Sequence, residues 1–399
     1  MRKQQSGALI AMLLSLVGIA ICAHLTYLHL ALLRGEIVGG IGCGAAGSVF
    51  NCHVVTASPF GRFLDVPLSL WGLLGYLVAF SLALIAWQLP ERAANALAGL
   101  TLLSLGFITM DAGLFAVMAT QLHHFCPLCL ATYAVNLLML IIAKTVSAKP
   151  WAQITRSAST LATELTPPRR GSAAGWIFWG IVLTGAAGVF SVNGSVLYMA
   201  RGSPAAFRKQ LAEFTTQRPR VQVDTTGDPV MGASDGAIQI VEFSDFLCPS
   251  CQRAWSFNPI LLAGHMHEAS FAFKNFPLDS TCNSALNRVV HAGACDVAAA
   301  AECAHEQGKF WEFQDLAFKA GPAYKASSID GDAASLGLDM EKFHACQQSG
   351  RGIEAVKRDI AQAVQINVTR TPTYVINGVV IEGLVNPVMF EELIETVRK

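Results

Sequence analysis

Five long stretches without Asp, Glu, Lys or Arg run through the first half of the chain. They cover residues 4–33, 66–90, 93–110, 112–143 and 171–200. A helix needs about 20 apolar residues to cross the hydrocarbon core of a bilayer. A Gln-Leu-His-His segment at 121–124 divides the fourth stretch, so one span ends there and another follows. We therefore predict five membrane-spanning helices, over residues 8–33, 68–88, 94–120, 127–146 and 174–199.

The composition of the 399-residue chain agrees with a membrane protein of two or three domains. Hydrophobic residues make up 53% of the chain, charged residues 14%, and the net charge is zero. Such a composition predicts contact with the lipid bilayer and argues against a nucleic-acid partner. The first span lacks a small-residue cleavage site and its apolar core is too long for a signal peptide. We therefore expect it to be retained.

The positions of Lys and Arg predict how the spans are oriented. Arg2 and Lys3 precede the first span. The segment between the fourth and fifth spans holds basic residues and a single acid, namely Lys144, Lys149, Arg156, Arg169, Arg170 and Glu164. This bias places the N-terminus and residues 147–173 in the cytoplasm. The 34–67 loop, the 121–125 turn and the whole tail after the fifth span then lie outside.

Two Cys-x-x-Cys motifs are the main chemical feature of the chain. Cys126-Pro-Leu-Cys129 begins the fourth span, and Cys248-Pro-Ser-Cys251 lies between a strand-like and a helix-like run in the second half. A two-residue gap places both sulfurs on one helical turn, so each pair can cycle between dithiol and disulfide. A four-cysteine metal site is the alternative. Nothing in the sequence brings the two pairs together, so we expect no metal.

A third cysteine pair, Cys43 and Cys52, lies in the external loop, where residues 39–44 include four glycines. Glycine makes a loop mobile, so this pair can shuttle electrons between an external partner and a fixed pair at the membrane surface. A static disulfide that closes the loop is the alternative.

The second cysteine of the membrane motif, Cys129, lies one turn deeper than Cys126, at a depth where a hydrophobic quinone can take electrons. Ser69 is an interior polar residue that can hydrogen-bond a quinone oxygen, or it can be a helix-packing serine. Asp111 is a carboxylate within a span and so a functional candidate. Its alternative role is a packing contact near the outer interface.

The external cysteine pair, the Pro67-Leu-Ser-Leu-Trp-Gly segment and Phe125-Cys-Pro-Leu-Cys together resemble the vitamin K epoxide reductase family over residues 8–146. The resemblance implies a four-helix bundle around a quinone, either ubiquinone or menaquinone, with the Cys126–Cys129 pair beside it. It also implies that Ser69 is the quinone-site serine and that Cys43 and Cys52 form the loop shuttle. The fifth span resembles the extra helix of bacterial members that carry a fused thioredoxin-like domain.

The second half of the chain has the alternating and turn-forming patterns of a soluble α/β domain. Residues 201–235 are polar with several Pro and Gly, which is typical of a linker. Residues 237–243 and 271–276 predict strands, and residues 283–366 are alanine-rich and predict helices broken near 321–322 and at Gly331. Residues 370–376 enter a strand, Asn377-Gly378 predicts a hairpin turn, and residues 387–398 predict a closing helix.

The strand, the Cys-x-x-Cys helix start and Thr371-Pro372-Thr373 before a hairpin resemble DsbA-like oxidoreductases of the thioredoxin superfamily over residues 236–399. The resemblance implies that Pro372 is cis and that Thr371 and Pro372 support the active site beside Cys248. Glu242 matches a buried acid of the family, or it is a surface residue at a strand edge. The dipeptide is Pro-Ser here, whereas the best-known member has Pro-His, and this dipeptide tunes the redox potential.

The remaining cysteines have predicted structural roles. Eleven is an odd number, so at least one thiol is unpaired within the chain, and Cys22 in the first span is expected to be a buried apolar filler. Four cysteines of the tail should pair in an oxidising compartment, namely Cys282, Cys295, Cys303 and Cys346. The pairing of Cys282 with Cys295 and of Cys303 with Cys346 is the simplest of three connectivities.

The sequence thus predicts a multi-domain membrane protein, with a four-helix bundle, a fifth linking helix and an α/β thioredoxin-like domain with a helical insertion. We expect domains over residues 1–146, 147–200, 201–235 and 236–399, in the bacterial inner membrane with the thioredoxin-like domain on the periplasmic side. The expected function is a quinone-dependent enzyme that forms disulfides in reduced exported proteins. A disulfide reductase or isomerase pathway, and a membrane-anchored redox sensor or chaperone, are the alternatives.

Overall fold

The computed structural model of the chain forms two compact units, Met1–Pro204 and Ala205–Lys399. It describes residues 2–33, 49–64, 66–165, 173–201, 217–233, 235–262 and 267–385. It also describes residues 209, 211, 213–215, 265, 390, 393–394 and 396–397.

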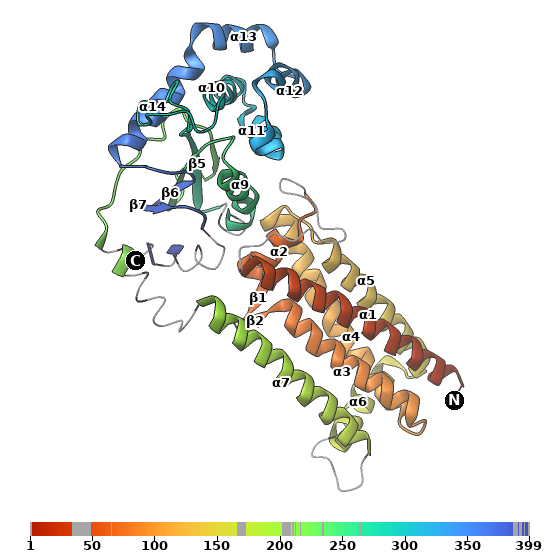
Figure 1. Ribbon diagram of the computed structural model, residues 1–399. Helices are drawn as coiled ribbons and strands as arrows, with labels where there is room; N and C mark the ends of the chain where they lie inside the picture. Colours follow the sequence, from red (N-terminus) through yellow and green to blue (C-terminus); the bar gives the residue numbers. More distant parts are fainter. Residues whose placement is uncertain are drawn as a thin grey trace. The chain divides into compact units, whose positions relative to one another are not determined.

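The first unit is a bundle of long apolar helices. These are α1 (Arg2–Leu33), α3 (Leu68–Gln88), α4 (Ala93–Val117), α5 (Pro127–Ser147) and α7 (Ala173–Arg201). Within this unit α1 packs against α3 and α5, α4 packs against α5, and α7 lies along α3 (Figure 1). In the part of the chain that the structure describes, five helices are long and apolar enough to cross a membrane. The prediction of five spans is therefore confirmed.

The third span ends where the polar segment at 121–124 predicted a break. After α4 the chain widens into a π-helical turn, η2 (Met118–Leu122), and His123 then adopts a left-handed conformation with φ 52°. A π turn and a left-handed residue both interrupt α-helical hydrogen bonding, so the chain reverses here and α5 can begin at Pro127.

Residues 151–165 were expected to be a cytoplasmic loop, but they form the helix α6 (Trp151–Leu165). Ile154, Leu161 and Leu165 are buried on one face, at helical spacing, and α6 packs against α4. The loop assignment was wrong because these few apolar residues are separated by polar ones, and only the helical period groups them on one face.

At the opposite end of the bundle from α6, short elements cover parts of residues 52–67 (Figure 1). They are α2 (Cys52–Ala57), η1 (Pro59–Gly61), β1 (Arg62–Phe63) and β2 (Val66–Pro67). Asn51 caps α2, since its side-chain oxygen accepts hydrogen bonds from the backbone N–H groups of His53 and Val54. This cap fixes the helix whose first residue is Cys52.

The second unit is built on a five-stranded sheet with the order β3-β5-β4-β6-β7. The strands are β3 (Val230–Gly232), β4 (Ile238–Ser244), β5 (Ala269–Asn275), β6 (Thr373–Ile376) and β7 (Val379–Glu382). β4 and β5 are parallel, joined by α9 (Pro249–Leu262), and the other neighbours are antiparallel. Residues 230–232 were expected to belong to a linker, but they pair with β5 as an edge strand.

Between β5 and β6 the chain inserts a set of helices. These are α10 (Ala294–His305), α11 (Phe310–Ala320), η3 (Gly321–Ala323), η4 (Ala326–Ser328), α12 (Ile329–Ser335), α13 (Met340–Ser349) and α14 (Arg351–Gln365). The break near residue 321 is confirmed, but Gly331 lies inside α12, where it is exposed. The predicted closing helix at 387–398 lies mostly outside the described residues.

The core of this unit is aromatic. Phe246 stacks on Phe318 with ring centroids 5.1 Å apart, and Phe273 lies 5.2 Å from Phe310. These rings join β5 and the loop after β4 to α11, so the sheet and the inserted helices share one core that includes the loop leading to Cys248.

Helices α10 and α14 approach closely at Gly352, and this contact predicts a stability effect. A Cβ atom there would overlap the carbonyl oxygen of Ala299 and lie 2.9 Å from Cys303 Sγ. Gly352→Ala should therefore destabilise the domain by about 1–3 kcal/mol. The matched control is Gly331→Ala, because a Cβ atom at Gly331 meets nothing within 4 Å and the helix gains up to about 1 kcal/mol. Calorimetric unfolding of both full-length variants measures the difference, and equal melting temperatures would contradict it.

Candidate functional site

The soluble cysteine pair lies at the junction of β4 and α9. The turn after Ser244 leads to Cys248, and Pro249 begins α9, so the first thiol meets the N-terminal end of a 14-residue helix. Cys248 is 6% exposed and Cys251 is fully buried. Both are free and buried thiols in this structure, and of the two only Cys248 retains any exposure to solvent.

The surroundings of the two thiols separate their pKa values. The Cys251 thiol, Thr371 and the backbone N–H groups of Ser250 and Cys251 lower the pKa of Cys248 to about 5, in spite of desolvation. Burial raises the pKa of Cys251 well above its usual range, and the nearby Cys248 sulfur raises it further. One thiol is therefore a thiolate at neutral pH while the other keeps its proton.

The Thr371–Pro372 peptide bond is cis, as the family resemblance implied, and it lies beside Cys248. The Cys248 thiol lies 3.7 Å from the carbonyl oxygen of Thr371, 123 residues away in sequence. The start of β6 therefore forms one wall of the site, and Thr371 itself is buried.

Glu242 lies in the centre of the sheet, not at a strand edge, because β4 is paired on both sides. It is 1% exposed, and its carboxylate accepts a hydrogen bond of 2.6 Å from the Asn258 side-chain amide. Desolvation raises the pKa of Glu242 to about 7, against the lowering effect of Asn258. A buried carboxyl with such a pKa can exchange a proton near neutral pH.

The other tail cysteines form two disulfides, Cys282–Cys295 and Cys303–Cys346. This is the connectivity that the sequence analysis named as the simplest. Cys303–Cys346 joins α10 to α13, and Cys282–Cys295 ties the loop after β5 to the start of α10. In the described part of the chain, no group of three or more His, Cys, Asp or Glu side chains is arranged to hold a metal ion.

In the membrane unit Cys126 and Cys129 form a disulfide at the start of α5. Cys126 is the N-cap, and its sulfur accepts the backbone N–H of Cys129 at 3.1 Å. Cys126 is fully buried, whereas Cys129 lines a cavity. The second cysteine is therefore the one that faces a space for a ligand.

A backbone bridge holds Cys52 beside Cys126. Phe50 and Phe125 form a parallel β-bridge, in which the N–H of Phe125 donates to Val49 O at 2.8 Å and the N–H of Asn51 donates to Phe125 O at 2.9 Å. Cys52, which is disulfide-bonded, and Cys126 are both fully buried in one apolar cluster. Cys43 lies outside the described residues.

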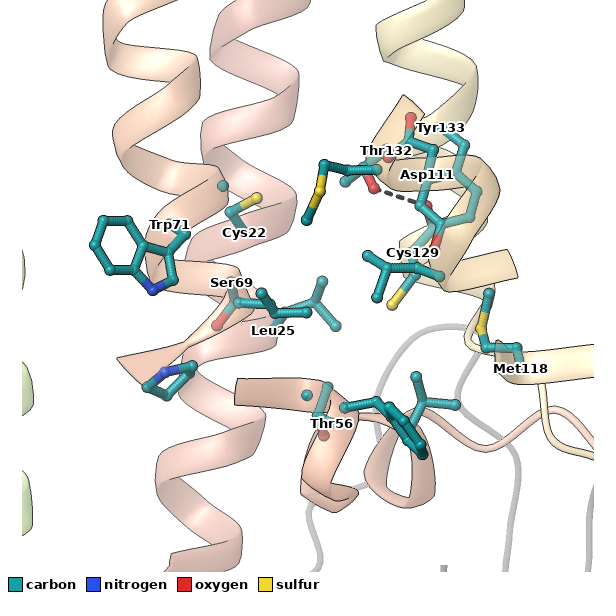
Figure 2. Close-up of a pocket in the computed structure, with 18 of the residues that line it drawn as sticks. Cys22, Leu25, Thr56, Ser69, Trp71, Asp111, Met118, Cys129, Thr132 and Tyr133 are labelled. Carbon is teal, nitrogen blue, oxygen red and sulfur yellow. Dashed lines mark hydrogen bonds between the residues drawn. The ribbon is translucent and has the colours of Figure 1, made fainter. Parts of the chain in front are cut away.

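The cavity has a volume of about 250 Å³ and lies between α1, α3, α4 and α5, with α2 at one end. Figure 2 shows Cys22, Ser69 and Trp71 on one side and Asp111, Cys129 and Tyr133 on the other. A cavity of about 150 Å³ holds a benzene ring, so this one has room for a substituted six-membered ring. Its lining is mostly apolar with a few polar groups, which is typical of a ligand site.

Two polar groups face each other across this cavity. The hydroxyls of Ser69 and Thr26 are 2.9 Å apart, and Thr26 Oγ1 also lies 2.8 Å from the carbonyl oxygen of Cys22. On the other side Asn136 donates to Asp111 Oδ2 at 2.9 Å, and the hydroxyl of Tyr76 donates to Asn136 Oδ1 at 2.7 Å. Asp111 is thus part of a polar network at the cavity and not only a packing contact.

Sequence reasoning missed Tyr76, Asn136 and Tyr133 as cavity residues, and it assigned Cys22 only a packing role. Cys22 is buried and free, as expected, but its side chain also lines the cavity. Asn136 is the residue from which the sequence could have indicated this polar network, because an amide within a span needs a polar partner. Which residue is that partner depends on how each helix is rotated about its axis, and the sequence does not give this rotation.

Models of known families match both halves of the chain. Residues 9–144 match the vitamin K epoxide reductase family, and residues 224–396 match a thioredoxin family. The chain therefore joins a vitamin K epoxide reductase family domain to a thioredoxin domain.

Curated relatives share only part of the chain. A Na(+)/H(+) antiporter NhaA from Herminiimonas arsenicoxydans is 32% identical over 169 residues, which is 42% of this chain and 25% of that protein. NhaA 3 from Salinispora tropica is 31% identical over 158 residues, covering 40% of this chain and 23% of the relative. The chain thus spans about a quarter of the length of these relatives.

Solved structures are also similar to part of the chain. A thioredoxin-like oxidoreductase from Silicibacter pomeroyi is 22% identical with a TM-score of 0.37, and it covers 47% of this chain and 96% of its own. BdbD from Bacillus subtilis is 21% identical with a TM-score of 0.36, covering 45% of this chain and 95% of its own.

The buried carboxyl of Glu242 predicts a pH-dependent stability. Its pKa is raised from 4.5 to about 7 in the fold, so the folded state holds more protons than the unfolded state between these values. This group therefore lowers the free energy of unfolding as pH rises through that window. Glu242→Gln removes the effect, and its stability relative to the parent should rise by on the order of 1–3 kcal/mol between pH 4.5 and pH 7. Calorimetry of both proteins across this range measures it, and a constant difference would exclude the assignment.

Proposed function

We propose that this chain is a membrane thiol–disulfide oxidoreductase that forms disulfides in exported proteins and passes the electrons to a membrane quinone. The observation that carries the proposal is Cys129, which is bonded to Cys126 on one side and faces a ring-sized, polar-edged cavity on the other. A redox-active sulfur that borders a cavity within the spans can exchange electrons with a lipid-soluble acceptor.

Electrons move from substrate thiols to Cys248–Cys251, then to Cys43–Cys52, then to Cys126–Cys129 and finally to the quinone. Each transfer between cysteine pairs is a thiol–disulfide exchange, in which a thiolate attacks a disulfide sulfur and the other sulfur leaves. The bridge between Phe50 and Phe125 supports the third transfer, because it places the Cys52 segment against the start of α5.

The separated pKa values of the tail cysteines favour oxidation of substrates. A substrate thiolate attacks Cys248, and Cys251 leaves with a proton because its own pKa is high. The second substrate thiol then attacks the substrate sulfur, and Cys248 departs as a thiolate that is stable at neutral pH. A stable thiolate stabilises the reduced pair, so the disulfide is a strong oxidant, which argues against the reductase pathway.

The buried Glu242 fits the proton needed in this cycle. Cys251 must gain a proton when it leaves and lose it again when the disulfide reforms. With its pKa near 7, the Glu242 carboxyl can exchange that proton at neutral pH. Thr371 and Pro372 position the peptide wall beside Cys248.

At the cavity, Ser69 and the Asp111 network are the groups that hold the acceptor. Ser69 can donate its hydroxyl hydrogen to a carbonyl oxygen, since the hydroxyl of Thr26 donates its own hydrogen to the Ser69 oxygen. Ubiquinone or menaquinone would accept two electrons from the Cys126–Cys129 dithiol and two protons, and Asp111 lies on the opposite side to exchange protons. We place the protein in a bacterial inner membrane, with the N-terminus in the cytoplasm and the thioredoxin-type domain on the periplasmic side.

The proposal predicts how two cysteine variants separate the steps. Purified full-length protein should reduce ubiquinone-1 or menaquinone-1 when given a reduced, unfolded substrate protein, and Cys126→Ala should abolish this with any electron donor. Cys248→Ala should abolish reduction driven by the substrate protein but keep reduction driven by dithiothreitol, because a small dithiol can reach the membrane pair directly. The measurement is the loss of substrate thiols in the absence of oxygen, at about two thiols per quinone.

If Cys126→Ala still reduced quinone at the parent rate, the relay would be overturned. If the full-length protein instead reduced disulfides of the substrate protein, the reductase alternative would be supported.

We expect Ser69→Ala to weaken quinone binding without affecting the thiol–disulfide exchange steps. The variant lacks one hydrogen bond to the acceptor, and such a bond contributes on the order of 1 kcal/mol, or about fivefold in the KM for quinone. The exchange between Cys248–Cys251 and the substrate protein should proceed at the parent rate, measured as the first turnover without quinone. An unchanged KM for quinone would assign Ser69 a packing role only.

A further inference from the structure

A buried carboxylate is built into the turn that carries the soluble cysteine pair. Asp245 follows β4, and its side chain is fully buried. One oxygen accepts the backbone N–H of Leu247 at 2.7 Å, and the other accepts the backbone N–H of Leu278 at 2.7 Å and Nδ1 of His291 at 2.8 Å. None of these interactions is used by the relay described above.

The backbone of Asp245 forms hydrogen bonds with both redox cysteines. Its carbonyl oxygen accepts the N–H of Cys248 at 3.1 Å, and its own N–H donates to Cys251 Sγ at 3.4 Å. A negative charge so close to a thiolate opposes formation of that thiolate. The buried carboxylate therefore works against a thiolate at Cys248 unless a cation compensates its charge.

His291 is placed to compensate it. It lies in the loop that precedes α10, and its side chain is 20% exposed. The hydrogen bond that His291 donates to Asp245 raises the pKa of His291 against the lowering effect of desolvation, and the negative charges of Asp245 and Cys248 raise it further. The imidazolium is thus favoured at the position where two negative charges converge.

The loop holds His291 rigidly. The backbone N–H of His291 donates to Leu278 O at 2.9 Å, and the N–H of the same Leu278 donates to Asp245. The Cys282–Cys295 disulfide closes the loop on either side of His291 and joins it to α10. A preorganised ion pair keeps more of its strength than one between mobile surface side chains.

The other titratable groups around the pair come from three elements. Glu242 on β4 favours its neutral form below pH 7, and Cys251 on α9 keeps its proton. Asp279, in the same loop as His291, accepts the N–H of Gly293 at 3.0 Å and two hydrogen bonds from Thr281. Those bonds lower the pKa of Asp279, so it adds a further negative charge to this region.

We propose that His291 is a positioning residue for the Cys248 thiolate: its imidazolium neutralises buried Asp245 and so keeps the leaving sulfur ionised. The side chain between the two cysteines cannot take this role here, because the dipeptide is Pro249-Ser250 and carries no charge. The proposal rests on the exchange chemistry assigned to Cys248–Cys251 above. When a substrate dithiol reduces that disulfide, the two electrons go to the sulfurs, one proton stays on Cys251, and the other leaves to water.

The test is the pH profile of Cys248 alkylation in the full-length, dithiothreitol-reduced protein in detergent micelles. Iodoacetamide modification of the Cys248 peptide is measured by mass spectrometry, without quinone. The parent should react half-maximally near pH 5. His291→Gln keeps a hydrogen-bond donor but loses the charge, so we expect the midpoint to rise by about one pH unit and the rate at pH 5 to fall about fivefold.

Two further variants separate charge from shape. His291→Lys restores a cation and should return the midpoint towards that of the parent. His344→Gln is the matched control, because His344 pairs with Asp330 at 3.2 Å on the exposed surface of α13, and it should leave the profile unchanged. The equilibrium with glutathione should shift so that His291→Gln is the weaker oxidant.

An unchanged Cys248 profile in His291→Gln would overturn the proposal. Equal shifts in His291→Gln and His291→Lys would also overturn it, since the effect would then come from shape and not from charge. Because the assay contains no quinone and no substrate protein, a failure of the proposed relay leaves this result readable. A failure here likewise leaves quinone reduction to be judged by its own assay.

Discussion

A cysteine at the first turn of a helix can hold a stable thiolate, because the helix N-terminus favours negative charge. A second cysteine three residues later lies close enough to form a disulfide with it. Both Cys-x-x-Cys pairs depend on this placement at a helix start. Cys126 caps α5 and Cys248 precedes α9. The elements before each pair are arranged accordingly, because β4 must end at Ser244 and α4 must end at Val117 for the two helices to begin where they do. The helical bundle and the α/β domain have different folds, but both place the first cysteine of the pair at a helix start.

The membrane unit turns this local device into a site by non-local contacts. The bridge between Phe50 and Phe125 places a loop cysteine against the start of α5, and four helices leave a cavity next to Cys129. In a bilayer each polar group must find a partner within the protein. The pairing of Tyr76, Asn136 and Asp111 at the cavity follows this rule and leaves a polar edge beside an otherwise apolar space.

The soluble unit contains a second non-local polar arrangement, centred on Lys274. Lys274 on β5 is buried between Asp228 at 2.6 Å and Asp359 at 3.0 Å. Removing one member of such a buried set leaves an uncompensated charge, so the set strongly favours one packing of its elements. Asp228 lies in the segment expected to be a linker, and the ion pair explains why that segment belongs to the domain together with β3.

Features that repeat over short distances could be predicted from the amino-acid sequence. Charge-free stretches of bilayer length predicted the five spans, alternation predicted β4 and β5, and the cysteine spacings predicted where both redox helices begin. These patterns are local, because each depends on residues within one or two turns or on the twofold period of a strand. Helix α6 has a local pattern too, but with few apolar positions it was overlooked.

Contacts between residues that are distant in sequence follow only from the packing of the folded chain. Asp245 and His291 are 46 residues apart, Tyr76 and Asn136 are 60 apart, and Cys248 meets Thr371 across 123 residues. No periodicity encodes such contacts, because they depend on how helices rotate about their axes and on which strands become neighbours. The separated pKa values of Cys248 and Cys251 are set in the same way, since the burial and hydrogen bonds that cause them exist only once the chain has packed.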